Sequence, residues 1–242
     1  MLQVVVVNYN CHFFLESLAY SLKKTSYDNY VLNVCDNGSG KESIKSLNRI
    51  AKDYKATLYF RQQSLCPAGA VHHAEAVEYI IANLNKDDYC LVIDVDCFML
   101  KTGWDQWLMR TINNRSIQSV VTGRIFGTDH EIRANPYLAF FKVDTIRKEN
   151  ISFKPDLIAG SKDKDFGYEL NKLNLKYISI VNPSSVLYGL PKKMINKSMD
   201  FVYKGEIIAS HLKMGGRGLK DIFFKYWDDR CKLYLKKVLH EK

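Results

Sequence analysis

The sequence predicts an α/β protein: a mixed, mainly parallel sheet flanked by helices, followed by an amphipathic helix at the C-terminal end. Short β-branched apolar runs alternate along the first hundred residues with segments whose apolar residues recur every three or four positions. Polar residues follow several of these runs directly, as they do at the carboxyl ends of parallel strands. This alternation is typical of βαβ units, whose helices cover both faces of a sheet.

The composition is that of an ordinary soluble globular protein, with 242 residues of which 47% are hydrophobic and 25% are charged. This length allows one substantial core, so we expect one domain with appendages. No run approaches the roughly 18 apolar residues that span a bilayer. The first ten residues lack the basic region and cleavage site of a signal peptide, so we interpret them as a first strand.

The cysteines indicate the cellular compartment, and the charge indicates which partners the protein could attract. The six cysteines are scattered without C-x-x-C pairs, which argues against a zinc site and favours reduced thiols in the cytoplasm. The net charge is +9, and the segment from His211 to Lys242 holds nine Lys and Arg against four Asp and Glu. Basic charge attracts nucleic acid, anionic lipid and phosphorylated small molecules alike, so it does not choose among these partners.

The first hundred residues divide into four strands and three helices. We expect strands at 4–7, 31–35, 57–60 and 89–95, and helices at 11–24, 44–54 and 71–84. Asn10 stands where its side chain can cap the first of these helices.

The second half is less regular. We expect, in order, a helix at 104–112, strands at 117–126 and 137–143, a helix near 163–174, strands at 177–181 and 201–209, and a helix from residue 219. The segment 190–200 is the strongest candidate for a mobile loop.

Asp94 and Asp96 follow the apolar run Leu91–Ile93. In an extended chain, alternation places both carboxylates on the same side of the strand. Two hard oxygen ligands a few Å apart suit Mg²⁺ or Mn²⁺ holding a diphosphate. The alternative is a solvated corner between strand and loop, a position that Asp also favours.

Four motifs, taken in order, resemble the nucleotide-sugar half of a GT-A glycosyltransferase of the family 2 type. They are VVVVNYN at 4–10, VCDNGSG at 34–40, SLCPAGAVHHA at 64–74 and LVIDVD at 91–96. The resemblance covers residues 3–100 closely and continues more loosely to about 218. It implies a GT-A domain at 1–218, with a nucleotide-binding half at 1–100 and an acceptor half at 101–218, followed by a basic amphipathic helix at 219–242.

The resemblance implies that Val7, Tyr9 and Asp36 bind the nucleotide base. Tyr9 would pack against the base, and Asp36 would accept a hydrogen bond from a ring N–H. A carboxylate acceptor matches the imide N–H of uracil, which favours UDP. The alternatives are that Asp36 closes an Asx turn and that Tyr9 is a packed, half-exposed aromatic residue.

The resemblance identifies Asp94 and Asp96 with the DxD motif. One carboxylate would bind the ribose or a metal-bound water, and the other would bind Mn²⁺ or Mg²⁺ bridging the two phosphates. His211 would complete the metal shell and would favour Mn²⁺, unless it is a solvated residue before a flexible turn. Lys213 or Arg217, in the glycine-rich stretch that follows, would neutralise the phosphates.

The third motif departs from the family pattern, because Ser64-Leu65-Cys66 replaces the usual Asn-x-Gly. Gly69 agrees with the pattern, as a small residue that lets the helix start approach the donor. For His72 and His73, which follow, packing or capping is favoured over catalysis.

The resemblance places a catalytic base just before or at the start of the helix near 163–174. Asp165 matches best, with Asp163 and Glu169 as alternatives. In an inverting displacement this base takes the proton of the acceptor hydroxyl. The other interpretation is that acidic residues simply favour a helix N-terminus. Four residues lie on the expected acceptor side without an assigned role: Arg124, Arg133, Asn135 and Tyr137.

Together these features predict a metal-dependent, inverting glycosyltransferase in glycan or polysaccharide synthesis. It would move a sugar from a nucleotide donor, preferably UDP-linked, to a hydroxyl of a glycan, lipid-linked or protein-linked acceptor. One alternative is a sugar nucleotidyltransferase, although such enzymes usually carry a glycine-rich loop after the first strand. The other is a non-catalytic basic module that binds nucleic acid or membrane. Paired carboxylates repel a polyanion, so we expect no nucleic-acid partner.

The C-terminal helix allows two interpretations. Its basic residues and the aromatic cluster Phe223, Phe224, Tyr226 and Trp227 suit peripheral contact with the cytoplasmic face of an anionic membrane. Alternatively, its aromatic residues pack on the domain or on a second subunit, which we favour because aromatic residues at helical spacing most often belong to a core.

Overall fold

The computed structural model describes residues 1–63, 69–113, 116–126, 131–156, 165–182, 184–186, 197–212 and 221–240. The strands are β1 (Leu2–Asn8), β2 (Tyr30–Asp36), β3 (Thr57–Phe60), β4 (Tyr89–Ile93), β5 (Cys97–Met99), β6 (Ser119–Phe126), β7 (Glu131–Lys142), β8 (Leu175–Val181), β9 (Ser198–Tyr203) and β10 (Glu206–Leu212). The helices are α1 (His12–Thr25), α2 (Lys41–Tyr54), α3 (Gly69–Ala82), α4 (Trp104–Ile112), α5 (Val143–Lys148), the 3₁₀ helix η1 (Tyr168–Lys172) and α7 (Asp221–His240).

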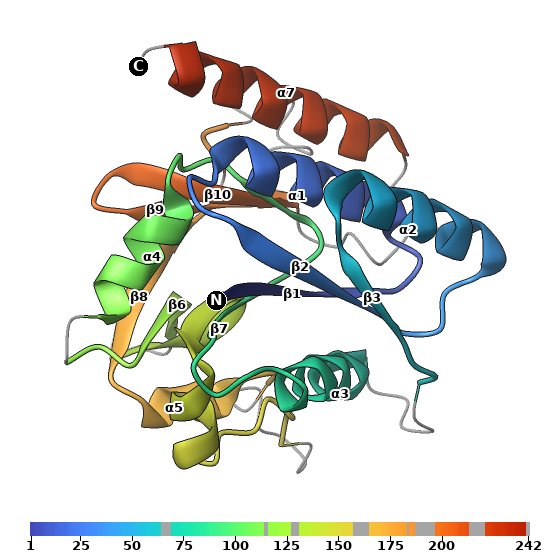
Figure 1. Ribbon diagram of the computed structural model, residues 1–242. Coiled ribbons are helices and arrows are strands. Elements are labelled where there is room, and N and C mark those ends of the chain that lie inside the picture. The colour runs from blue at the N-terminus through green and yellow to red at the C-terminus, as the bar shows by residue number, and fades with distance from the viewer. Residues whose placement is uncertain are drawn as a thin grey trace.

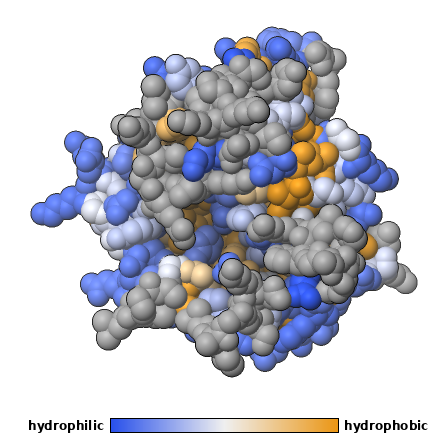
Figure 2. All heavy atoms as spheres, turned by 180° about the vertical axis from the view of Figure 1, so that it is seen from behind, coloured by the Kyte–Doolittle hydropathy of each residue, from blue (hydrophilic) through white to orange (hydrophobic). Residues whose placement is uncertain are grey.

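All of these strands form one mixed sheet, in the order β3-β2-β1-β4-β7-β6-β8-β9-β10-β5. Helices α1, α2 and α7 lie on one side of it, and α3 and α5 lie on the other (Figure 1). The α/β class and the helices that flank a mixed sheet are therefore confirmed. Among the described residues seen from behind, those at the outer rim are mostly hydrophilic, and hydrophobic ones gather mainly in an area to the upper right of the centre (Figure 2).

The first four strands are parallel. Strand β1 pairs with β2 on one side and with β4 on the other, and β2 pairs with β3. The strand order therefore reverses between β1 and β4, and the flanking helices α1 and α3 lie on opposite faces of the sheet (Figure 1). Such a reversal opens a crevice beyond the carboxyl ends of the two strands, where ligands bind in open α/β sheets.

The second half of the sheet turns back towards β4. Strands β4 and β7, β7 and β6, β8 and β9, β9 and β10, and β10 and β5 are antiparallel, and β6 and β8 are parallel. Strand β5 ends the sheet order, yet only Asp94–Asp96 separate it from β4. Four peptide units span at most about 14 Å, so the far edge of the sheet must lie close to β4.

Three hydrophobic clusters hold these layers together. One packs α1, α2 and α4 on the sheet, and another packs α3 and α5 on the opposite face. The third joins α7 to α1 and β5, and it buries Trp227, Cys231 and Leu235 to 1% exposure or less. The packed face of the C-terminal helix is therefore part of the domain core. Among the described residues, no helix combines the length and apolarity needed to cross a membrane.

The predicted elements agree with most of the observed ones. The strand at 57–60 and the helix at 104–112 have the predicted bounds, and the remaining elements of the first half differ by a few residues. Strand β5 and helix α5 were not predicted, because three and six residues are too few to show a period.

In the second half, one predicted strand is wrong and the predicted mobile loop is tested only at its end. The strand predicted at 201–209 is a hairpin of β9 and β10, since Lys204 and Gly205 adopt positive φ angles of 50° and 80° and turn the chain. The loop predicted at 190–200 lies outside the described residues up to 196, and Ser198–Asp200 belong to β9.

The helix predicted near 163–174 is wrong where the structure describes it. Only the short 3₁₀ helix η1 forms, because Gly167 has a φ of +67° and interrupts any longer α-helix. A Cβ at Gly167 would also lie 2.6 Å from Pro136 Cγ, so glycine is required there.

Asn10 does not cap the first helix. Cys11 is the N-cap of α1, and Asn10 itself has a φ of 54°. Its side-chain Oδ1 instead accepts a hydrogen bond from the Gly40 N–H at the start of α2 (2.9 Å). Asn10 therefore ties the end of β1 to the turn that follows β2.

The packing of α7 makes a testable difference between two adjacent aromatic residues. We expect Trp227→Ala to lower the free energy of unfolding by about 3–5 kcal/mol, because it empties a buried site against Phe14 and Phe98. Tyr226→Ala is the matched control: its side chain is 47% exposed, and the change should stay within about 0.5 kcal/mol. Urea unfolding measures both. Equal effects of the two substitutions would contradict the packing of α7.

Candidate metal centre

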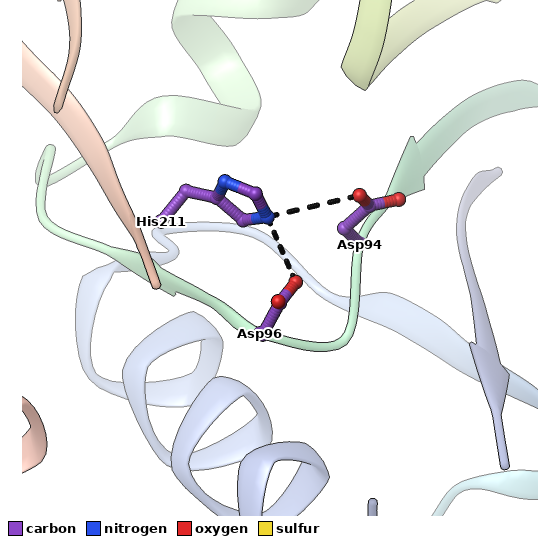
Figure 3. Close-up of side chains that lie close together, drawn as sticks. All are labelled: Asp94, Asp96 and His211. Carbon is purple, nitrogen blue, oxygen red and sulfur yellow. Dashed lines mark hydrogen bonds and ion pairs between the residues drawn. The ribbon is translucent and has the colours of Figure 1, made fainter. Parts of the chain in front are cut away.

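Asp94 and Asp96 lie in the turn between β4 and β5, and not in an extended strand as predicted. The turn is closed by a hydrogen bond from the Cys97 N–H to the Asp94 carbonyl (3.1 Å), and the Asp94 N–H donates to the Tyr137 carbonyl (3.0 Å). The chain therefore bends at the two aspartates. The bend still directs both carboxylates to one place (Figure 3).

The pairing of β5 with β10 delivers His211 to the same place. His211 stands opposite Cys97 in this antiparallel pair, and the Leu212 N–H donates to the Asp96 carbonyl (3.0 Å). Its Nε2 lies 2.9 Å from Asp96 Oδ1 and 3.8 Å from Asp94 Oδ2 (Figure 3). The Tyr137 ring stacks on the imidazole, with ring centroids 4.7 Å apart, and holds its plane.

These three side chains form a donor set that fits a divalent cation. One ligand atom from each of Asp94, Asp96 and His211 lies within 4.8 Å of the other two. The side chains are 22%, 11% and 5% exposed, so water compensates the two negative charges only in part. Two carboxylate oxygens and one imidazole nitrogen suit Mn²⁺ better than Mg²⁺, since Mg²⁺ prefers oxygen alone.

Burial and like charge perturb the titration of the Asp94 carboxyl. Burial, together with the negative charge of Asp96, raises the pKa of the Asp94 carboxyl to about 7. The nearby His211 opposes this shift. A bound divalent cation would reverse the effect by favouring the ionised carboxylate.

His73, for which packing was favoured, lies beside the cluster. Its Nε2 is 3.8 Å from Asp94 Oδ1, and its ring packs edge-on against Phe166 with centroids 4.5 Å apart. Burial lowers the pKa of the His73 imidazole to about 4, although the charges of Asp96 and Asp165 oppose the shift. Its place in the first turns of the helix after β3 was the only sequence signal of this location.

The residues predicted to bind the base lie at the carboxyl ends of β1 and β2. Tyr9 is 49% exposed, whereas the Val7 side chain is 7% exposed and belongs to the core. Asp36 is 2% exposed and accepts hydrogen bonds from Asn8 Nδ2 (2.9 Å), the Ser39 hydroxyl (2.5 Å) and the Ser39 N–H (2.9 Å). These bonds match the Asx-turn alternative, so the contact of Asp36 with a base stays a prediction.

Gly69 begins α3, and a Cβ built on it would meet no atom of the described residues within 4 Å. Packing within the described residues therefore does not demand glycine there. The residues Ser64–Cys66, Lys213 and Arg217 lie outside the described residues.

The candidate base Asp165 is exposed and precedes η1. Its Oδ1 accepts a hydrogen bond from the Phe166 N–H (2.7 Å), and its charge reaches His73. Glu169 instead accepts from the Ser152 N–H and from Lys172, both at 2.7 Å, so it is engaged in the fold. Asp163 lies outside the described residues, as does the Arg124 side chain.

Comparisons by sequence and by fold give different results. No protein-family model matches the chain, and no curated protein is similar to it in sequence. By fold, it resembles the galactosyltransferase LgtC in complex with donor and acceptor sugar analogues, with a TM-score of 0.57 and 14% identity over 98% of this chain and 96% of that one.

Two further structures share the fold. The mannosyltransferase PcManGT from Pyrobaculum calidifontis, in complex with GDP-Man and Mn²⁺, aligns with a TM-score of 0.55 and 13% identity over 73% of this chain. The alignment spans 54% of that mannosyltransferase, about half its length. TarS 1–349 from S. aureus, in complex with UDP, aligns with a TM-score of 0.50 and 13% identity over 81% of this chain and 69% of that one. The GT-A fold implied by the motifs is therefore confirmed.

The pKa of Asp94 predicts how cation binding depends on pH. Below pH 7 the carboxyl of the metal-free protein holds a proton that the cation must displace. We therefore expect the Mn²⁺ affinity, measured by calorimetry, to fall by about tenfold per pH unit below pH 7 and to level off above it. In Asp94→Asn the affinity should be lower and its pH dependence shallower. A constant wild-type affinity between pH 5 and 7 would contradict this electrostatic description.

Proposed function

We propose that this protein is a metal-dependent glycosyltransferase that moves a sugar from a nucleotide donor to an acceptor hydroxyl. The observation that carries the proposal is the cluster of Asp94, Asp96 and His211 beyond the end of β4, in a chain with the GT-A fold. The cluster lies where the strand order reverses, which is the place where α/β sheets of this kind bind ligands.

The cation that fits this cluster is Mn²⁺, with Mg²⁺ as the alternative. Asp94 and Asp96 would each supply an oxygen and His211 its Nε2. When bound, such a cation supplies positive charge that stabilises the departing nucleoside diphosphate. Arg217 or Lys213 would add positive charge to the phosphates from the following segment. The mannosyltransferase that shares the fold was solved with Mn²⁺, which supports this choice.

The donor we infer is a UDP-linked sugar. The base would lie against Tyr9, whose ring is half-exposed beyond β1, near the end of β2 at Asp36. Val7 would contribute through its backbone, since its side chain is in the core. Gly69 has no side chain, and no described residue crowds it, so the donor would approach the start of α3 there. Solved structures with this fold contain UDP in one case and GDP-Man in another, so the identity of the nucleotide base must be measured directly.

We propose Asp165 as the catalytic base of a reaction that inverts the configuration of the anomeric carbon. Its carboxylate is exposed to an incoming acceptor, and its negative charge acts on the pKa of His73 beside the metal cluster. An ionised carboxylate in this position would take the proton as the acceptor hydroxyl attacks. The acceptor would be a glycan, free or linked to lipid or protein.

A cytoplasmic location is also part of the proposal. All of the described cysteines are buried thiols outside any disulfide: Cys11, Cys35, Cys90, Cys97 and Cys231. Helix α7 packs its Trp227 face on the domain, which leaves exposed lysines such as Lys225, Lys236 and Lys237 outside. Contact of that outer face with an anionic membrane surface would bring lipid-linked acceptors within reach.

A panel of nucleotides tests the donor site. UDP, GDP, dTDP and CMP would each be added with and without Mn²⁺, and the melting temperature recorded. We expect stabilisation by UDP that requires Mn²⁺, because a ligand at about 100 times its Kd adds roughly 2.7 kcal/mol to the stability. Stabilisation by a different nucleotide would reassign the base, and no shift with any of them would refute the donor site.

Two substitutions distinguish the role of the metal ligands from the role of the catalytic base. Asp96→Asn should abolish both Mn²⁺-dependent UDP binding and transfer while leaving the melting temperature nearly unchanged. Asp165→Asn should keep UDP binding but lower kcat by about 10²–10⁴-fold, the usual contribution of general base catalysis. Glu42→Gln, on the exposed start of α2, is the control and should behave as wild type. Full transfer activity in Asp96→Asn would exclude the metal assignment.

A further inference from the structure

We propose that His73 is a positioning residue that orients Asp94 towards the metal ion by donating a hydrogen bond to its outer oxygen. The inference rests on the proposed function, since it concerns the same cation. It assigns a role to a side chain that lies in the third motif without a ligand or catalytic role there and outside the cluster of three ligands.

The two oxygens of Asp94 face two different imidazoles. Asp94 Oδ2 lies 3.8 Å from His211 Nε2, on the side of the other candidate ligands. Asp94 Oδ1 lies 3.8 Å from His73 Nε2, on the side of α3. A carboxylate held in this way would bind the cation through Oδ2 and leave Oδ1 for a donor. Metal-binding carboxylates are commonly oriented by such an outer hydrogen bond.

His73 has a donor available for this bond. Its Nε2 is buried, and it has no hydrogen-bond partner among the described residues. The separation of 3.8 Å from Asp94 Oδ1 is too long for a hydrogen bond and too short for a water between the two atoms. A movement of about 1 Å closes the gap to an ordinary bond length, and a buried polar atom without a partner favours such a movement.

The ring of His73 is placed by well-packed parts of the fold. The Asn37 side chain donates to the carbonyl of the preceding residue, His72 (2.8 Å), and so ties this turn of α3 to the end of β2. The imidazole packs edge-on against Phe166, with an interplanar angle of 65°. Asp94, in turn, is tied to β7 through its N–H. Only a small adjustment of these two side chains is needed to form the bond.

The test compares a variant that removes the donor with one that keeps it. His73→Phe retains a ring against Phe166 but cannot donate, whereas His73→Gln places an amide N–H near the position of Nε2. Mn²⁺ binding would be measured by calorimetry in the absence of nucleotide. We expect His73→Phe to bind Mn²⁺ about 10–100-fold more weakly, the usual effect of losing an outer-shell partner, and His73→Gln to bind within a few-fold of wild type. His240→Ala, at the exposed end of α7, is the control.

The metal-free proteins distinguish positioning from a structural role. Because Nε2 has no hydrogen-bond partner in the described structure, His73→Phe should melt at the same temperature as wild type or slightly higher when no metal is present. Unchanged Mn²⁺ affinity in His73→Phe would overturn the inference while leaving the metal centre intact. Failure of the wild-type protein to bind Mn²⁺ would overturn the proposed function, and this inference with it.

A spectroscopic measurement on the wild-type protein needs no substitution. Long-range ¹H–¹⁵N correlation in the presence of Mg²⁺ reports which nitrogen of the His73 imidazole carries the proton. A protonated Nε2 is required for donation to Asp94. A neutral ring protonated at Nδ1 in the Mg²⁺-bound protein would overturn the inference even if His73→Phe did not fold.

Discussion

The antiparallel pairing of β5 with β10 is the contact on which the candidate site depends. Strand β5 follows Asp96 directly, so whatever pairs with it also reaches the two aspartates. The register places His211 opposite Cys97, and the hydrogen bond from the Leu212 N–H to the Asp96 carbonyl fixes this alignment. A shift of the register by one residue would turn His211 to the other face of the sheet and remove it from the cluster.

The electrostatics of the cluster make a cation the simplest explanation of its residues. Two carboxylates in a largely buried site repel each other, and in the metal-free protein this repulsion, together with burial, raises the pKa of Asp94 to about 7. A chain under no other constraint would avoid this cost with apolar or amide side chains. The imidazole of His73 lies near one oxygen of Asp94 and the imidazole of His211 near the other, so each carboxylate oxygen faces its own histidine. This arrangement suits a ligand that must be held in one orientation.

Much of the fold could be predicted from the sequence, because the first four strands are apolar runs separated by helical periodicity. The Asp94–Asp96 pair and His211 were also identified, although their proximity followed from the family resemblance and not from spacing. Other features depend on which distant residues pair with each other, and a single sequence does not reveal those pairings. The hairpin at Lys204–Gly205, the turn at Asp94–Asp96 and the location of His73 beside Asp94 are of this kind. The prediction of a helix near 163–174 failed for a local reason, since Gly167 adopts a positive φ at a place where a Cβ would lie against Pro136, and the apolar periodicity does not show this.

The most direct test of the metal centre is a crystal structure of the protein with Mn²⁺ and UDP, with data collected at the manganese absorption edge. We predict a single anomalous peak between Asp94 Oδ2, an Asp96 oxygen and His211 Nε2, at about 2.0–2.3 Å from each, with the diphosphate on its open side. A peak elsewhere, or UDP bound without manganese at this cluster, would contradict the claim that these three side chains hold the catalytic ion.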